Sequence, residues 1–281
     1  MTTLEYRFVN DILIKMLFVQ YPHLLKRLVA NILGIPLASI TQFVITNTEI
    51  VPEHLGEKFC RLDINMNVNG QRVELEFQIA NLGDYPDRSL YYWAREFSSA
   101  LSEGMDYVML PTTIVISILD FKLFDCKEYF SEFRPLEVTR HTLLTEKQRL
   151  LYFELPKLAE LTDADIHDEL KLWLMLFKAK TEEELKQIEK LEVPVMAEAI
   201  NAYRLVSATD EFKELERLRS RARHNEAAAL RHAAEVEREK WQVVVAEKDT
   251  AHAAELAEKD TALANQEALI KELMAKLAEN K

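Results

Sequence analysis

The dipeptide Asn69-Gly70 is the feature that most constrains how this chain can fold. It stands between two runs in which apolar and polar residues alternate. Both central positions of a type I′ turn need a positive φ, which Asn and Gly tolerate better than other residues. The sequence therefore predicts a two-residue β-hairpin in which Val68 faces Gln71.

This register divides the hairpin into an apolar and a polar face, because successive strand residues point to opposite sides. The apolar face takes three facing pairs: Leu62 with Phe77, Ile64 with Leu75, and Met66 with Val73. The polar face takes Asp63 with Glu76, Asn65 with Glu74, and Asn67 with Arg72, and Gln78 follows on the same side. Carboxylates that face each other repel, so Asp63 and Glu76 need a compensating charge.

Two explanations fit the facing carboxylates. A hard divalent cation such as Mg²⁺ binds one or two carboxylates together with water and phosphate oxygens. Alternatively, the polar face is the solvated outside of an ordinary hairpin, and Arg61 or Arg72 screens the negative charge. The hairpin alone leaves both explanations open.

Composition narrows the class of protein. A chain of 281 residues can bury a full core and carry an extension. We expect no secretory signal and no membrane span, since no apolar run approaches the ~20 residues that a span needs. The two cysteines, Cys60 and Cys126, offer no disulfide framework and no metal-binding spacing, which predicts buried free thiols in a reducing cytoplasm. The net charge of −12 argues against a simple electrostatic nucleic-acid binder, so any DNA contact must be local or helped by metal.

The segments around the hairpin predict helices. Residues 4–34 have helical spacing with one interruption at Tyr21-Pro22, which indicates two helices. On the first helix Asp11 and Lys15 are four residues apart and share a face, which fits an ordinary exposed ion pair as well as a site.

After the hairpin, Asp87 is a candidate N-cap for a helix that carries Arg88 and Tyr92 and that Gly104 closes. Residues 108–121 form a nearly continuous β-branched run, which is typical of a strand buried on both faces. Together these elements predict an α/β fold, a small mixed sheet with helices on it, whose open edge exposes the carboxylates and Gln78.

The last part of the chain is predicted to be helical from residue 151 onward. Residues 209–281 contain no Pro or Gly, and residues 246–256 recur as 257–267, an eleven-residue repeat. A narrow apolar seam with a spacing of seven takes Leu256, Leu263, Ile270 and Leu277. We therefore expect three parts: a core over 1–150, a helical extension over 151–208, and a charged Ala/Glu/Lys-rich coiled-coil-like tail over 209–281 that forms a homo-oligomer.

The order of these segments resembles the PD-(D/E)XK nuclease family transposases, the recombination-promoting nuclease group. The similar segments are ND-ILIK (10–15), LLKRLVANIL (24–33), RLDINMNVNGQRVELEFQI (61–79), residues 87–121, and LWLMLF (172–177). The resemblance covers about residues 1–230 and leaves the tail outside. It implies a restriction-endonuclease-like core and metal-dependent cleavage of DNA, with Mg²⁺ as the cofactor and Mn²⁺ as the alternative.

The resemblance also implies roles for particular residues. The implied catalytic residues are Asp63, Glu76, Gln78, Asp11 and Lys15. The implied metal ligands are Asp63, Glu76 and the backbone carbonyl of Phe77. Arg88 and Tyr92 match the helix after the motif and are expected to bind substrate. Gln78 stands where the wider superfamily has lysine. Since glutamine supplies no positive charge, Lys15 or Arg88 is the candidate for that role.

Two functions remain open from the sequence. The first is a metal-dependent DNA endonuclease. The second is a degenerate nuclease fold that acts as an oligomeric binding or assembly module, which the acidic charge and the missing lysine favour. A metallohydrolase of another kind has little support, because the chain has no clustered histidines and no HExxH spacing.

Overall fold

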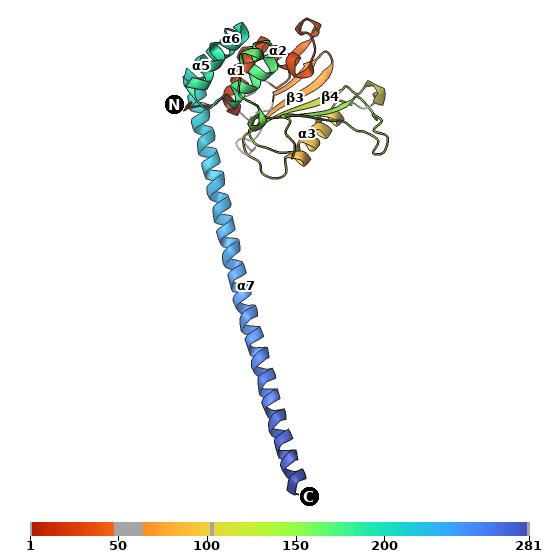
Figure 1. Cartoon of the computed structure of the whole chain (residues 1–281), viewed down its shortest axis with the longest axis vertical. Helices are drawn as coiled ribbons and strands as arrows, with labels where there is room; N and C mark the ends of the chain where they lie inside the picture. Colours follow the sequence, from red (N-terminus) through yellow and green to blue (C-terminus); the bar gives the residue numbers. More distant parts are fainter. Residues whose placement is uncertain (1, 48–63, 102–103, 280–281) are drawn as a thin grey trace. The chain divides into compact units, whose positions relative to one another are not determined.

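The computed structural model describes residues 2–47, 64–101 and 104–279 (Figure 1). Its α-helices are α1 (Asp11–Gln20), α2 (Pro22–Leu33), α3 (Tyr85–Ser99), α4 (Glu169–Lys178), α5 (Glu182–Glu189), α6 (Pro194–Ala208) and α7 (Asp210–Glu279). Its strands are β1 (Phe43–Ile45), β2 (Ile64–Val68), β3 (Gln71–Gln78), β4 (Thr113–Leu119), β5 (Phe130–Phe133) and β6 (Gln148–Glu154).

The strands form one mixed sheet in the order β1-β2-β3-β4-β6-β5. β1, β2 and β3 are antiparallel neighbours, β4 runs parallel to both β3 and β6, and β5 is antiparallel to β6. The predicted α/β class, with helices around a small mixed sheet, is confirmed. β3 lies inside the sheet between β2 and β4, so it is not an edge strand.

The hairpin at Asn69-Gly70 has the predicted turn and register. Asn69 has a φ of 51° and Gly70 a φ of 83°, the positive values that a type I′ turn requires. From this turn outward, β2 and β3 pair residue by residue as the sequence predicts. The outermost predicted pairs, including the one that involves Asp63, lie outside the described residues.

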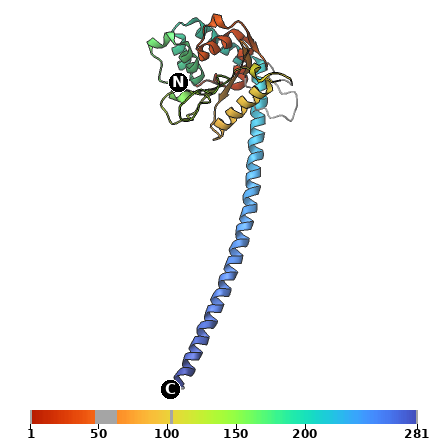
Figure 2. The same cartoon turned by 90° about the vertical axis from the view of Figure 1, so that its right-hand side faces the viewer.

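The two faces of the sheet are covered by different helices. One face is apolar and packs on a core built largely from α1, α2, α4 and α6, where the ring of Phe77 lies 5.0 Å from that of Phe177. The other face is covered by α3, whose Trp93 donates a hydrogen bond from Nε1 to the carbonyl oxygen of Thr113 at 3.0 Å. Figure 1 and Figure 2 show α3 on the opposite side of the strands from α1 and α2. The residues of β3 that face α3 are those of the polar face of the hairpin.

The first two helices and the buried strand agree with the sequence. Asn10 caps α1 by accepting a hydrogen bond from the backbone N–H of Leu13, and α2 ends at Gly34 in the left-handed conformation. Every residue of β4 is buried, as its β-branched run predicts.

Four local predictions are wrong. The helix after the hairpin, α3, ends at Ser99 with Ala100 as its C-cap, before Gly104 is reached. α3 begins at Tyr85, after Asp84 and with Pro86 in its first turn, because proline suits the start of a helix better than its interior. The chain is not helical from residue 151, because β6 continues to Glu154; pairing with β4 and β5 on both sides outweighs the helical propensity of its leucines. Cys126 is exposed, since it lies in the loop before β5.

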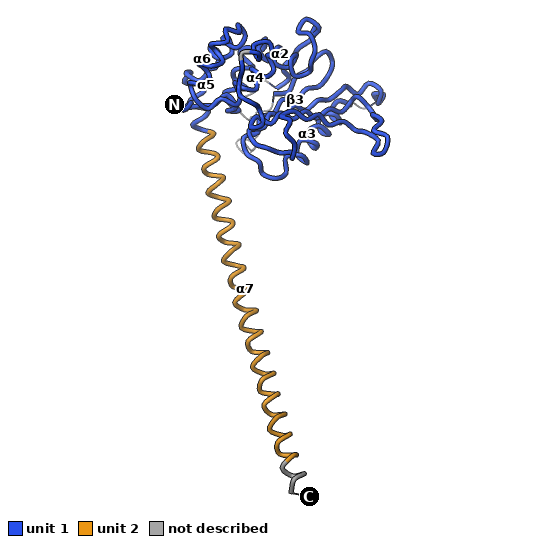
Figure 3. Tube along the Cα trace, in the orientation of Figure 1, with its two compact units in different colours: residues 1–218 blue, residues 219–281 orange. Residues whose placement is uncertain are grey.

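The chain divides into two compact units, residues 1–218 and residues 219–281 (Figure 3). Helices α4, α5 and α6 belong to the first unit together with the sheet, and the predicted division at 150 falls within β6. The functional division into core, extension and tail stays a prediction. Among the described helices, none has both the length and the apolar character of a membrane span.

We expect Gly70→Ala to lower the free energy of unfolding by about 1 kcal/mol, because a Cβ disfavours positive φ by roughly this amount. Apart from Gly70 itself and its two chain neighbours, no residue has an atom within 4 Å of the Cβ that the substitution adds, so the cost comes from the backbone conformation. Urea unfolding of the variant measures the loss. Ser98→Ala, on the exposed side of α3, is the control, and an equal loss in both variants would contradict the prediction.

Candidate active site

Glu76 is the centre of a polar network beneath α3. It lies on β3, on the face of the sheet that α3 covers, and only 3% of the residue is exposed. The hydroxyl of Tyr85 donates to its Oε2 at 2.7 Å, and Nε2 of Gln78 donates to its Oε1 at 2.6 Å. Hydrogen bonds of this kind stabilise the charged form of a carboxylate. Both carboxylate oxygens are thus held by neighbouring side chains.

Gln78 connects Glu76 to a positive charge. A guanidinium nitrogen of Arg88 donates to Oε1 of Gln78 at 2.6 Å, and this contact orients the amide with its NH₂ group toward Glu76. The guanidinium carbon of Arg88 also lies 5.1 Å from the centre of the Tyr85 ring, within the range of a cation–π contact. One helix therefore supplies both the phenol and the guanidinium of this network.

Two further hydroxyl groups surround the carboxylate. The hydroxyl of Ser117, on the neighbouring strand β4, lies 2.8 Å from that of Tyr85. Tyr152 on β6 and Ser89 on α3 form a separate pair, with their oxygens 2.6 Å apart. Burial, together with the negative charge of Glu76, raises the pKa of Tyr85 well above its ordinary value. Burial likewise raises the pKa of Tyr152. Both phenols are therefore neutral at pH 7, and Tyr85 can act as a donor.

Glu74 brings a second carboxylate to the same side of β3. It precedes Glu76 by two positions, roughly 7 Å at the usual rise of a strand, and it is only 2% exposed. Burying two carboxylates so close together is costly, because each loses hydration and the two repel. Oxygen ligands of this kind suit a hard divalent cation, so this face of β3 fits a Mg²⁺ site in its chemistry.

The structure corrects two expectations about this face. Glu76 is not exposed at an open edge, because β3 is internal and α3 covers it. The polar face is also not the solvated outside of a hairpin: Arg72 donates to the Glu96 carbonyl oxygen at 2.9 Å and to Oγ of Ser99 at 2.6 Å, both on α3. The polar face of the hairpin is an interface between sheet and helix.

The remaining predicted residues have different environments. Asp63 lies outside the described residues. Phe77 points its ring to the opposite, apolar face, and its carbonyl as a ligand stays a prediction. Lys15 is 2% exposed, which excludes the ordinary exposed pair with Asp11. Tyr92 is buried, with the guanidinium carbon of Arg95 5.9 Å from its ring centre.

The structure thus brings together Glu76, Gln78 and Arg88 from the predicted set, and it adds Tyr85 and Ser117. The sequence gives little sign of these two residues. Tyr85 reads as part of a turn before a proline, and Ser117 is one polar residue within a buried strand. Within the described parts of the chain, no group of three or more His, Cys, Asp and Glu side chains is arranged to hold a metal ion.

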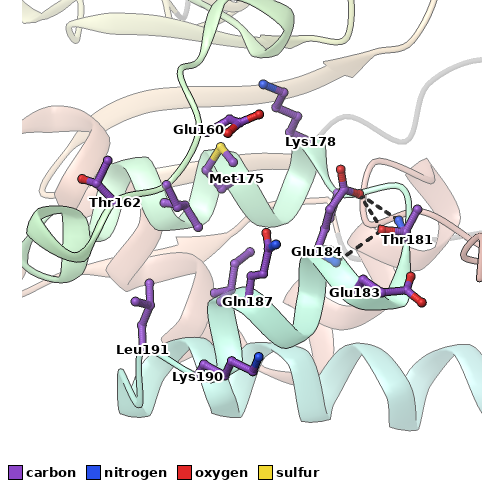
Figure 4. Close-up of a pocket in the computed structure, with 13 residues that line it drawn as sticks. Glu160, Thr162, Met175, Lys178, Thr181, Glu183, Glu184, Gln187, Lys190 and Leu191 are labelled. Atoms are coloured by element: carbon purple, nitrogen blue, oxygen red, sulfur yellow. Dashed lines mark hydrogen bonds between the residues drawn. The ribbon is translucent and has the colours of Figure 1, made fainter. Parts of the chain in front are cut away.

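A separate pocket lies in the helical layer on the other side of the sheet (Figure 4). Its volume is about 670 Å³, and its walls come from α4, α5 and the segment before α4. Lys178 on its rim donates to the carbonyl oxygen of Leu158 at 2.7 Å, and Glu184 accepts hydrogen bonds at the start of α5. These charged groups have structural partners, and no residue of the Glu76 network lines the pocket, so we do not assign the chemistry to it.

We expect Arg88→Met to lower the free energy of unfolding by about 1–2 kcal/mol, because it removes a charged donor from Gln78 and leaves a half-buried acceptor without it. Arg95→Met on the same helix is the matched control, since the contact to Gln78 comes from Arg88 and since Arg95 is exposed where Arg88 is half-buried. Thermal or urea unfolding compares the two. A loss at Arg95 as large as the loss at Arg88 would contradict the role of the Gln78 contact.

Comparison with known proteins gives one match. A family model described as PD-(D/E)XK nuclease family transposase matches residues 9–233. No curated protein and no solved structure matches the chain.

Proposed function

The chain belongs to the PD-(D/E)XK nuclease family transposases, and we propose that it is a Mg²⁺-dependent DNA endonuclease that hydrolyses phosphodiester bonds in recombination. Nucleases of this kind generally use divalent metals. The observation that carries the proposal is the buried carboxylate of Glu76, which Gln78 and Tyr85 hold from two sides beneath α3.

In this proposal Asp63 and Glu76 hold the metal, together with the backbone carbonyl of Phe77. A bound divalent ion supplies an activated water and stabilises negative charge on the scissile phosphate. Glu76 is preorganised for this task, because both its oxygens already have fixed donors and each retains a further lone pair. Tyr85 stays protonated and neutral beside it.

The positive charge that a lysine supplies elsewhere in the superfamily comes here from Arg88. Gln78 occupies that position and is neutral, but the guanidinium of Arg88 lies within 2.6 Å of its amide oxygen. A guanidinium keeps its charge at any pH at which DNA is cleaved, and it suits phosphate oxygens. Arg88 therefore binds substrate phosphate next to the metal site, while Gln78 positions the attacking water. The proposed set of site residues also includes Asp11 and Lys15 on α1 and Tyr92 on α3.

We further propose that α7 forms a homo-oligomer. Leu256, Leu263 and Ile270 are about half exposed along a helix that is otherwise rich in Ala, Glu and Lys. An isolated polar helix of this kind gains little stability in water, and pairing of the seam would bury these side chains. Assembly would place several nuclease units on one complex.

The first test is cleavage of supercoiled plasmid by the purified full chain with Mg²⁺ or Mn²⁺, and with EDTA. We expect cutting only with metal, and a loss of more than about 100-fold in Asp63→Ala and in Glu76→Gln, since losing a direct ligand should exceed the 10–100-fold cost of losing an outer partner. Asp87→Asn, an exposed acid in the first turn of α3, is the control and should cut at the parent rate.

Folded protein that never cuts DNA with either metal would favour the alternative, a degenerate nuclease fold that works as a binding or assembly module. Cutting that survives Glu76→Gln unchanged would instead place the active site elsewhere in the chain.

The second test concerns the tail. We expect Leu256→Glu combined with Leu263→Glu to dissociate the oligomer in analytical ultracentrifugation, because four or more charges would meet in the seam of the assembly. Ala257→Glu combined with Ala268→Glu adds the same charge on a different side of the helix and should leave the oligomer intact. A parent chain that sediments as a monomer would refute assembly through α7.

A further inference from the structure

Tyr85 combines full burial with a polar contact to the candidate metal ligand. It is the first residue of α3, it is 1% exposed, and it is among the largest fully buried side chains of the described chain. Its hydroxyl lies 2.7 Å from Oε2 of Glu76 and 2.8 Å from Oγ of Ser117. A buried hydroxyl is costly unless it is hydrogen-bonded, and here both of its neighbours are polar.

The ring of Tyr85 is fixed from three directions. The rings of Phe121 and Tyr152 meet it edge to face, each with centres 6.3 Å away and at interplanar angles of 87° and 83°. The guanidinium of Arg88, one turn along α3, covers its face at 5.1 Å. A ring held in this way cannot turn its hydroxyl away from Glu76 without moving its neighbours.

A phenylalanine would fill the same apolar space, so packing alone does not explain a tyrosine at this position. The hydroxyl adds a hydrogen-bond donor to one carboxylate oxygen of Glu76, and Gln78 donates to the other. A carboxylate that is held at both oxygens cannot rotate about its terminal bond, and its remaining lone pairs point in fixed directions.

We propose that Tyr85, with Ser117 behind it, is a positioning residue that fixes the Glu76 carboxylate in the orientation in which it binds a divalent cation. This rests on the proposed function, because it assumes that Glu76 is a metal ligand. Tyr85 itself does not touch the metal or the DNA. It acts as the outer partner of a ligand, a class of residue whose loss typically weakens metal binding by about 10–100-fold.

The test is Tyr85→Phe in the full-length protein, with metal binding as the readout rather than cleavage. Isothermal titration with MnCl₂ and with MgCl₂ measures the dissociation constant, and the metal-induced rise in the thermal unfolding midpoint gives a second measure. We expect the dissociation constant to rise by about 10-fold or more and the rise in the midpoint to shrink accordingly. Unchanged or tighter binding would overturn the proposal.

Two matched controls separate positioning from the loss of any tyrosine hydroxyl. Tyr152→Phe removes a buried hydroxyl that contacts Ser89 and belongs to the same cluster of rings as Tyr85. Tyr91→Phe removes an exposed hydroxyl from α3, the helix that also carries Tyr85. Both should bind metal like the parent. If Tyr152→Phe weakens binding as much as Tyr85→Phe, the effect is a general loss of packing and the proposal fails.

Ser117→Ala covers the case in which Tyr85→Phe does not fold, since it removes only the second partner of the phenol. It should weaken metal binding by less than the about 10-fold expected for the loss of a direct outer partner, because Tyr85 stays in place. Unchanged affinity would count against the proposal. Glu76→Gln distinguishes the role of Glu76 as a metal ligand from the role of Tyr85 in positioning it. Binding that Glu76→Gln abolishes but Tyr85→Phe leaves unchanged refutes the positioning role alone, whereas a parent chain that binds neither metal refutes both.

Discussion

The burial of the Glu76 carboxylate is the constraint on which this structure depends most. A charged group this far from water must be compensated, because its lost hydration costs several kcal/mol. The protein compensates it with a phenol from the start of α3 and with the amide of Gln78, which Arg88 orients in turn. The position of α3 on the sheet is therefore tied to the chemistry of one side chain on β3.

One face of the sheet forms the main core, and the other face carries the candidate active site. On one face, apolar side chains of β3, β4 and β6 pack against α1, α2 and α4 and form the main core. On the other face, the same strands present Glu76, Ser117 and Tyr152 to α3 beside a smaller apolar cluster. Because neighbouring residues of a strand point to opposite faces, the polar group is held rigidly by a well-packed core directly behind it.

The second compact unit, residues 219–281, differs from the first in the contacts that stabilise it. The first unit is stabilised by contacts between residues far apart in the sequence, whereas the side chains of residues 223–274 in α7 are exposed. Ion pairs four residues apart, such as Glu255 with Lys259, add only a few tenths of a kcal/mol to such a helix. An apolar seam along it is consistent with a partner helix, and this is why we propose assembly for this part of the chain.

The hairpin could be predicted from the amino-acid sequence alone, because Asn69-Gly70 and the strict alternation around it are local signals that admit one register. The buried strand β4, the first two helices and the long tail could also be predicted, each from a pattern within one segment. The burial of Glu76, the strand β6 and the meeting of Tyr85 and Ser117 at the carboxylate are seen only in the folded chain. Those facts depend on which elements pack together, and a contact between β3, β4 and α3 leaves no periodic trace in any one of them.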